Sequence, residues 1–237
     1  MTPFYIVVLL KSYIISYLYI IEMKTRRSRQ SNRTTKKQYL ACLKSHYPSC
    51  KHDEDRSDRH LYKGHDITYG EMEYTGIDAL YKHITKKYDK DINAFIDVGS
   101  GRGKLCMYMA AQPKIKTVLG VELVKQRHDD AVHLKDLLAK EYSKKVELLN
   151  KNIFEVDLKE FRDSRVFVWF SNLCFDQSTT NEIFHKLYEE LPKGSIICCS
   201  KVFDIQRETG NEYEYIESTP IKMSWTRSSN VYIYKTV

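Results

Sequence analysis

The feature of this sequence that most limits its fold is a short apolar run that ends in an acid and a glycine-rich turn. The run from Ala94 to Val98 contains Asp97, and Gly99 to Gly103 follow directly, before a helix-like stretch from Lys104 to Ala111. A strand that turns on glycines into a helix begins a βαβ unit, and glycines let a ligand approach the backbone closely. The pattern therefore predicts an α/β fold with a ligand site at the end of this strand.

The spacing of the glycines excludes two common phosphate-binding motifs. A dinucleotide fingerprint needs a third glycine three residues after Gly101, where Lys104 stands, and the phosphate-cradling G-x-x-x-x-G-K loop cannot be placed. Glu122 ends the next expected strand, about 20 residues beyond the turn, where an acid can accept both hydroxyls of a ribose. Asp97 can receive an ammonium group. Together, an acid for a ribose and an acid for an ammonium group predict a ligand that contains adenosine and an amino-acid end.

The rest of the chain alternates between helical and strand-like patterns. Apolar residues at helical spacing, from Ile77 to Ile84, precede the first strand. Later helices are expected at about 127–142 and 179–191, and later strands at 117–122, 146–149, 165–170 and 195–200. Two strand-like runs, Ile221 to Thr226 and Val231 to Lys235, flank a polar stretch and predict a terminal antiparallel hairpin. The alternation predicts a Rossmann-like, mostly parallel seven-stranded sheet over residues 59–237.

Positive charge is concentrated near the amino terminus. The formal net charge is +7, and seven basic residues between positions 24 and 37 match it, with no acid between Lys24 and Leu40. They are Lys24, Arg26, Arg27, Arg29, Arg33, Lys36 and Lys37. We expect residues 23–58 to form a flexible arm, apart from a short helical stretch at Lys37 to His46. The arm can bind DNA phosphates or remain a solvated tail.

Residues 1–22 are almost wholly apolar from Pro3 to Ile21, broken by Lys11. They are either a signal anchor, which would tether the chain to a membrane with the remainder in the cytoplasm, or a stretch ahead of the true start at Met23. The six cysteines have neither a disulfide-framework spacing nor, together with the nearby histidines, the spacing of a zinc site. We expect reduced thiols and no metal.

Several segments resemble the disruptor-of-telomeric-silencing family of histone lysine methyltransferases, and the glycine turn resembles motif I of class I methyltransferases. The segments run in the family's order from position 69 to the end. They are Tyr69-Gly70-Glu71, the Asp97 to Lys104 turn, Glu122, Ser171 to Phe175, Ser200 to Phe203, Ser224-Trp225-Thr226 and Tyr232. The resemblance implies a monomeric, S-adenosyl-L-methionine-dependent protein lysine N-methyltransferase that acts in the nucleus on a core histone within nucleosomes.

The resemblance also implies roles for single residues. Tyr69 and Glu71 would fold over the methionine end of the cofactor, Asp97, Gly99 and Gly101 would line it, and Glu122 would hold its ribose. Asn152, with Ile153 or Phe154, would lie beside the adenine, although the family usually has an aspartate at that first position. Asn172 would lie near the transferred methyl group. Phe175, Trp225 and Tyr232 would wall a lysine channel, with Asn172, Tyr69 and Tyr232 as positioning residues.

The cofactor motif alone leaves the substrate open, because a fold does not determine a substrate. A methyltransferase of a non-histone protein or of RNA would use the same motif. A catalytically silent module that binds chromatin or nucleic acid through the basic arm is a further alternative, although such a module has no need of both Asp97 and Glu122.

Overall fold

The structure is a computed structural model that describes residues 34–47, 70–203 and 213–237. The chain divides into two units, Met1–Thr35 and Lys36–Val237. The apolar segment 1–22, Tyr69 and the arm residues Arg26, Arg27, Arg29 and Arg33 lie outside the described residues. Within the described ranges, no helix is both long and apolar enough to cross a membrane.

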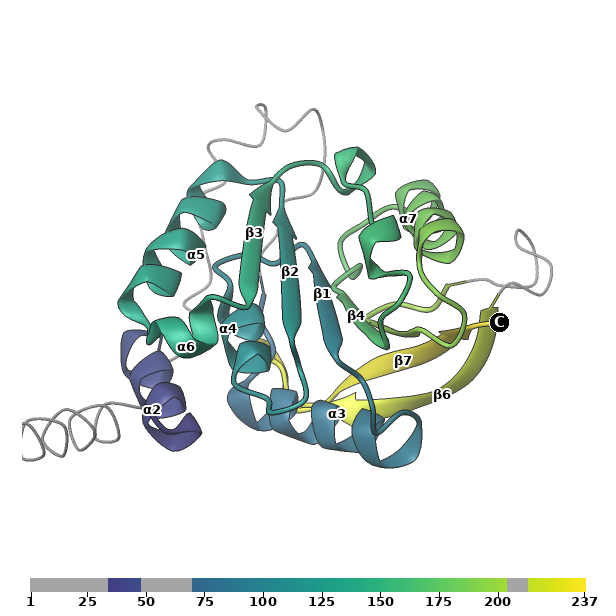
Figure 1. Cartoon of the computed structure of the whole chain (residues 1–237). Coiled ribbons are helices and arrows are strands. Elements are labelled where there is room, and N and C mark those ends of the chain that lie inside the picture. The colour runs from purple at the N-terminus through teal and green to yellow at the C-terminus, as the bar shows by residue number, and fades with distance from the viewer. Residues whose placement is uncertain (1–33, 48–69, 204–212) are drawn as a thin grey trace, which may run out of the picture. The chain divides into compact units, whose positions relative to one another are not determined.

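The second unit is built on one seven-stranded sheet with the strand order β3-β2-β1-β4-β5-β7-β6. Strands β1 to β5 are parallel, and β7 pairs antiparallel with both β5 and β6 (Figure 1). The strands are β1 Ala94–Val98, β2 Thr117–Glu122, β3 Val146–Asn150, β4 Val166–Phe170, β5 Ile196–Cys199, β6 Tyr213–Ile221 and β7 Ser229–Thr236. This arrangement confirms the predicted mostly parallel sheet with a C-terminal antiparallel hairpin.

Helices cover both faces of this sheet (Figure 1). They are α2 Lys36–His46, α3 Tyr74–Lys87, α4 Lys104–Ala110, α5 Lys125–Leu137, α6 Lys140–Ser143 and α7 Gln177–Glu190, with 3-10 turns η2 Ile153–Glu155 and η3 Lys159–Phe161. The single helix expected at 127–142 is therefore two helices, because Leu138 and Ala139 adopt extended or other non-helical conformations between them. Helix α7 begins two residues earlier than predicted, where Asp176 accepts the backbone N–H of Thr179 at 2.8 Å.

Two apolar clusters lie on opposite faces of the sheet, because successive side chains of a strand point to opposite sides. In β1, Phe95 belongs to the first cluster, which contains side chains of α2, α3 and α4. Its neighbour Ile96 belongs to the second cluster, which contains side chains of α7 and both 3-10 turns. We call these the α4 face and the α7 face, and the distinction decides which predicted site residues can meet.

Helix α2 lies within the range 23–58 that the sequence assigned to a flexible arm. Its Tyr39 and Leu43 are fully buried in the cluster of the α4 face. Lys36 Nζ donates a hydrogen bond to Gln112 Oε1 at 2.7 Å. The helical stretch expected at 37–46 is confirmed, and the boundary at residue 58 is wrong for these residues, because two buried apolar side chains attach the helix to the core.

The first strand of the terminal hairpin was also misplaced. It is Tyr213–Ile221, and residues 222–226, expected to form it, make only an isolated bridge between Met223 and Met72. Strand β6 lies at the edge of the sheet, where only its two end residues are buried, so it carries polar residues and tolerates Pro220. An edge strand of this kind lacks the continuous apolar pattern that marks the inner strands.

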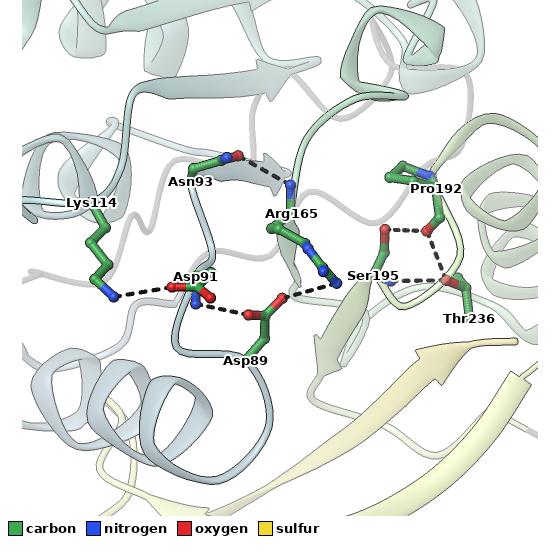
Figure 2. A network of polar contacts seen from close by, with 8 residues as sticks. All are labelled: Asp89, Asp91, Asn93, Lys114, Arg165, Pro192, Ser195 and Thr236. Atoms are coloured by element: carbon green, nitrogen blue, oxygen red, sulfur yellow. Dashed lines mark hydrogen bonds and ion pairs between the residues drawn. The ribbon is translucent and has the colours of Figure 1, made fainter.

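Polar contacts hold together the edge of the sheet where the parallel strands begin and β7 ends (Figure 2). Before β1 and β4, Asn93 Oδ1 accepts the backbone N–H of Arg165 at 3.1 Å. Near β5 and β7, the Ser195 N–H donates to Thr236 Oγ1 at 3.0 Å, and both hydroxyls donate to the Pro192 carbonyl oxygen. The polar groups at this end of the sheet bond to one another. A ligand is therefore expected at the opposite end, where the parallel strands end.

Candidate active site

The glycine turn after β1 has the backbone conformation that the sequence predicts. Gly99, Gly101 and Gly103 all have positive φ angles, of 78°, 54° and 76°. A residue with a side chain pays roughly 1–2 kcal/mol in this left-handed region. The N–H groups of Gly99 and Ser100 donate to the Val121 carbonyl oxygen at 2.9 and 3.0 Å, so the turn is joined to the end of β2.

Glu122 stands at the end of β2 and is held by backbone groups. Its Oε2 accepts the Gly101 N–H at 2.7 Å, and its Oε1 accepts the Val124 N–H at 2.8 Å. Burial raises the pKa of Glu122, while these hydrogen bonds act in the opposite direction. The carboxylate therefore has a defined position beside the glycine turn.

Asn150, at the end of β3, was missed by sequence reasoning. Its Nδ2 donates to the carbonyl oxygens of Glu122 and Leu123 at 2.9 and 3.0 Å. It thereby supports the loop that carries the Glu122 carboxylate. Its position, as a polar residue at the end of a predicted parallel strand, was the sequence signal that could have identified it.

Asp97 is an almost fully buried carboxyl group on the α4 face. Its Oδ2 accepts a hydrogen bond from the Cys106 thiol, with an S to O distance of 3.6 Å. Burial raises the pKa of Asp97 well above its usual range, and the carboxylates of Glu122 and Glu71 raise it further. A positive charge brought into this site would stabilise the ionised form of Asp97.

A pocket opens at the carboxyl ends of β1 and β4, next to Asp97. Its lining is Gly70, Glu71, Met72, Asp97, Gly99, Ser100, Lys104, Leu105, Trp169, Ser171 and Trp225. Of the predicted site residues, the pocket brings together Glu71, Asp97, Gly99 and Trp225. Lys104 and Ser171 were not predicted as site residues, although both stand in segments that carried the family resemblance.

Two chain segments far apart in sequence form one wall of this pocket. The Ser224 N–H donates to the Glu71 carbonyl oxygen at 2.7 Å, and the Glu71 N–H donates to Ser224 Oγ at 3.1 Å. Gly70 lies so close to Trp225 that a Cβ atom there would be 2.5 Å from the indole ring. The absence of a side chain at Gly70 thus lets Trp225 reach the pocket.

A buried ion pair lies in the same wall. Lys104 Nζ is 2.7 Å from Glu71 Oε2, and the two side chains are 4% and 8% exposed. The Tyr47 hydroxyl donates to Glu71 Oε1, and the Tyr74 hydroxyl donates to the Tyr47 carbonyl oxygen at 2.9 Å. Neither Tyr47 nor Lys104 could be connected to Glu71 by sequence spacing, because they come from different elements.

Asn172 follows β4 and is fully buried. Its Oδ1 accepts the backbone N–H groups of Ser200 and Lys201 at 3.0 and 2.8 Å, and its Nδ2 donates to the Lys201 carbonyl oxygen at 3.1 Å. The side chain therefore joins the loops after β4 and β5. It does not line the pocket, whereas its neighbour Ser171 does.

The three aromatic residues expected to wall one channel are separated. Trp225 lines the pocket and packs against the cluster of the α4 face, whereas Phe175 and Tyr232 pack against the cluster of the α7 face. Phe175 contacts Phe170, with 5.3 Å between ring centroids. Tyr232 alternates with Val231 and Ile233 along β7 and packs on the other side of the sheet from Trp225, so a lysine channel that uses all three aromatic residues stays a prediction.

The residues expected beside an adenine follow β3. Asn152 caps η2 by accepting the Phe154 N–H at 3.2 Å. Ile153 is buried in the cluster of the α7 face, but the Phe154 side chain is 41% exposed. Of the two apolar candidates, only Phe154 has a surface free for contact with a ligand.

Sequence comparison connects most of the chain to one family. The sequence model described as "Histone methylation protein DOT1" matches residues 47–237. A curated relative, the H3 lysine-79 specific histone-lysine N-methyltransferase of Drosophila melanogaster, is 24% identical over 142 residues, or 57% of this chain. The matched region amounts to 7% of that relative, so the chain spans only a small part of its length.

Solved structures of methyltransferases share the fold. Magnesium protoporphyrin IX methyltransferase from Synechocystis PCC 6803, with bound S-adenosylmethionine, has a TM-score of 0.52 and 10% identity, covering 84% of this chain and 91% of its own. The glycopeptide N-methyltransferase MtfA has a TM-score of 0.51 and 10% identity, covering 69% and 97%. At these identities the likeness establishes the fold, which is Rossmann-like and of the class I methyltransferase type.

Proposed function

The chain belongs to the family of the histone methylation protein DOT1, and from this premise we propose that it is an S-adenosylmethionine-dependent protein lysine N-methyltransferase. The substrate we propose is a lysine of a core histone within nucleosomes, which places the enzyme in the nucleus. The observation that carries the proposal is the pair of buried acids, Asp97 and Glu122, at the ends of adjacent parallel strands beside the glycine turn. That arrangement suits an adenosine ligand with a cationic amino-acid end.

The residues present fit S-adenosylmethionine. Glu122 would accept the ribose hydroxyls, and Gly99 and Gly101 would allow close approach of the backbone. Asp97 and Glu71 would receive the ammonium group, and the raised pKa of Asp97 supports this assignment because a nearby cation would offset its burial. The exposed ring of Phe154 would contact the adenine. When bound, the cofactor supplies a methyl group activated by the sulfonium.

The chemistry demands positioning more than proton abstraction. Methyl transfer is an in-line displacement, so the protein must align a neutral amine and exclude water. Lysine has an ordinary pKa of about 10.4, and desolvation beside a cationic sulfonium lowers it and favours the neutral amine. Trp225 would shield this amine in the pocket, and Asn172 would act by holding the loops after β4 and β5 in place.

The basic arm fits a nucleosomal substrate. Lys and Arg side chains bind DNA phosphates without reading sequence, and such binding weakens steeply with salt. Arg26, Arg27, Arg29, Arg33 and Lys37 would make these contacts. Lys36 would contribute less, because its ammonium group donates to Gln112 on the folded unit. A monomeric enzyme is part of the proposal.

The test is transfer of a labelled methyl group by the 237-residue chain. Nucleosomes, free histones, total RNA and a histone-free lysate are each incubated with labelled S-adenosylmethionine. Glu122→Gln should abolish labelling, because the amide cannot accept both ribose hydroxyls while it also meets two backbone N–H donors. Glu189→Gln, on the exposed side of α7, is the matched control and should leave labelling unchanged.

Label on a lysine of a nucleosomal histone, lost in Glu122→Gln alone, is the expected result. Label confined to RNA or to a non-histone protein would keep the methyltransferase and remove the histone substrate. No labelling of any fraction, together with no binding of the cofactor, would contradict the proposed function and favour a silent binding module.

A further inference from the structure

The Glu71 carboxylate has a different partner on each oxygen, and the partners come from two elements. Tyr47, directly after α2, donates its hydroxyl to Oε1, and Lys104, at the start of α4, pairs with Oε2 at 2.7 Å. Tyr47 is itself held, because its N–H donates to the Leu43 carbonyl oxygen at 2.9 Å and its own carbonyl accepts the Tyr74 hydroxyl. The position of Glu71 at the pocket therefore depends on helix α2.

Lys104 has almost no contact with solvent, so its charge must be balanced locally. Its Nζ lies 5.2 Å from the centre of the Tyr74 ring and 5.7 Å from that of the Tyr47 ring, in addition to its contact with Glu71. Cation–π contacts of this kind add to the ion pair when the cation is desolvated. Tyr47 thus meets both members of the pair, the carboxylate through its hydroxyl and the ammonium through its ring.

A buried ion pair is a weak source of stability, because the cost of desolvating both charges offsets most of their attraction. An apolar pair of similar volume would serve the core equally well. A charged pair in the wall of a ligand pocket instead keeps a carboxylate in one place with one orientation. The location of this pair, on the lining beside Asp97, therefore suggests a role in ligand recognition.

We propose that Tyr47 is a positioning residue for Glu71, through which helix α2 helps the pocket to bind the ammonium end of its ligand. The inference rests on the proposed function, since it takes an S-adenosyl amino acid as the ligand. Tyr47 contacts Glu71 and Lys104 and does not itself line the pocket. Substitution of Tyr47 should therefore weaken the binding of ligands that carry the amino-acid end and leave unchanged the binding of ligands that lack it.

The test compares two probes by calorimetric titration of the full chain. S-Adenosylhomocysteine carries the amino-acid end, and 5′-methylthioadenosine lacks it. Tyr47→Phe removes the hydroxyl and keeps the ring over Lys104. The matched control is Tyr39→Phe in helix α2, where the buried hydroxyl has no hydrogen-bond partner among the described residues. We expect Tyr47→Phe to weaken S-adenosylhomocysteine binding about tenfold, the effect of one lost hydrogen bond to a charged group.

The same substitution should leave 5′-methylthioadenosine binding within about twofold, and Tyr39→Phe should leave both affinities unchanged. In a Glu71→Gln background, Tyr47→Phe should lose most of its effect, because its route to the ligand is gone. An equal loss for both probes would mean that Tyr47 only supports the fold, and it would overturn the proposal. So would an unchanged affinity for S-adenosylhomocysteine. If the unsubstituted chain binds neither probe, the proposed function fails first and the inference fails with it.

Discussion

The backbone N–H of Gly101 donates to the Glu122 carboxylate across 2.7 Å, which joins the glycine turn after β1 to the end of β2. The Glu122 carboxylate also accepts the Val124 N–H at 2.8 Å, so both of its oxygens contact the protein backbone. The conformation of the turn and the position of the acid are therefore one feature. Changes to the turn should affect ligand binding more than they affect folding.

Gly99→Ala should weaken S-adenosylhomocysteine binding, and it should cost no more stability than the same substitution at a glycine outside the pocket. Gly99 lines the pocket with a φ angle of +78°, and an added Cβ would meet no atom of the described residues within 4 Å, so the methyl group would occupy ligand space. Gly194→Ala is a matched control, with φ +87° and equally open surroundings away from the pocket. Both variants should lose roughly 1–2 kcal/mol in the free energy of unfolding, measured by urea titration, from the left-handed backbone. Equal binding losses in both would contradict the assignment.

Asp97→Asn should make the ligand-free protein more stable while it removes ligand binding. The folded-state pKa of Asp97 lies above its ordinary 3.8, so the folded protein holds a proton that the unfolded chain releases. The free energy of unfolding should therefore fall as pH rises above 3.8 through the folded pKa. The amide side chain of the variant does not ionise and therefore avoids this loss. We expect its free energy of unfolding at pH 7 to be about 1 kcal/mol higher than that of the unsubstituted protein. Exposed Asp163→Asn is the control, and urea titrations across pH give the measurement. A destabilised Asp97→Asn would refute the account.

Glu217 should contribute to stability against acid. It accepts the Tyr88 hydroxyl and lies 2.5 Å from both Lys87 Nζ and His83 Nε2, contacts that lower its pKa from 4.5 to about 2. Its contribution is complete above pH 4.5 and is lost as pH falls through 2. Glu217→Gln should cost up to about 1 kcal/mol at pH 7, because solvent screens an ion pair at the surface, and very little at pH 2, whereas exposed Glu214→Gln on the same strand should cost nothing. A pH-independent cost would exclude this ionic origin.

Helix α2 should be required for the stability of the folded unit. Leu43 is fully buried, so Leu43→Ala removes apolar contact and leaves a cavity, with an expected loss of about 2–4 kcal/mol in the free energy of unfolding. Leu137→Ala, at a side chain 44% exposed, is the same change outside the core and should cost under about 0.5 kcal/mol. Chemical denaturation followed by circular dichroism would measure both. Equal, small losses would show that α2 is not part of the core.

The inner part of the fold could be predicted because its signals are local. Strands β1 and β2 have the residues that the sequence indicated, since each is an apolar run that ends at an acid or glycine. Asp97 and Glu122 follow from these strand ends and lie near each other because β1 and β2 are parallel neighbours. Their proximity needed only the topology of a βαβ unit.

The parts that could not be predicted depend on contacts between distant segments. The Tyr47 hydroxyl reaches Glu71 across 24 positions, and Ser224 pairs with Glu71 across 153. No periodicity records such contacts. The edge strand β6 differs from the prediction because Ile221 to Thr226 is the more apolar stretch, but only Ile221 belongs to β6, and Trp225 lines the pocket instead.

The central claim is that the pocket lined by Asp97, together with the glycine turn that Glu122 holds, binds S-adenosylmethionine. Equilibrium dialysis of the 237-residue chain against the labelled cofactor tests it most directly, with Glu122→Gln and the exposed Glu189→Gln in parallel. The account predicts saturable binding at one site per chain, displaced by S-adenosylhomocysteine, retained in Glu189→Gln and at least tenfold weaker in Glu122→Gln. Absence of binding to the unsubstituted chain, or equal binding by all three proteins, would contradict it.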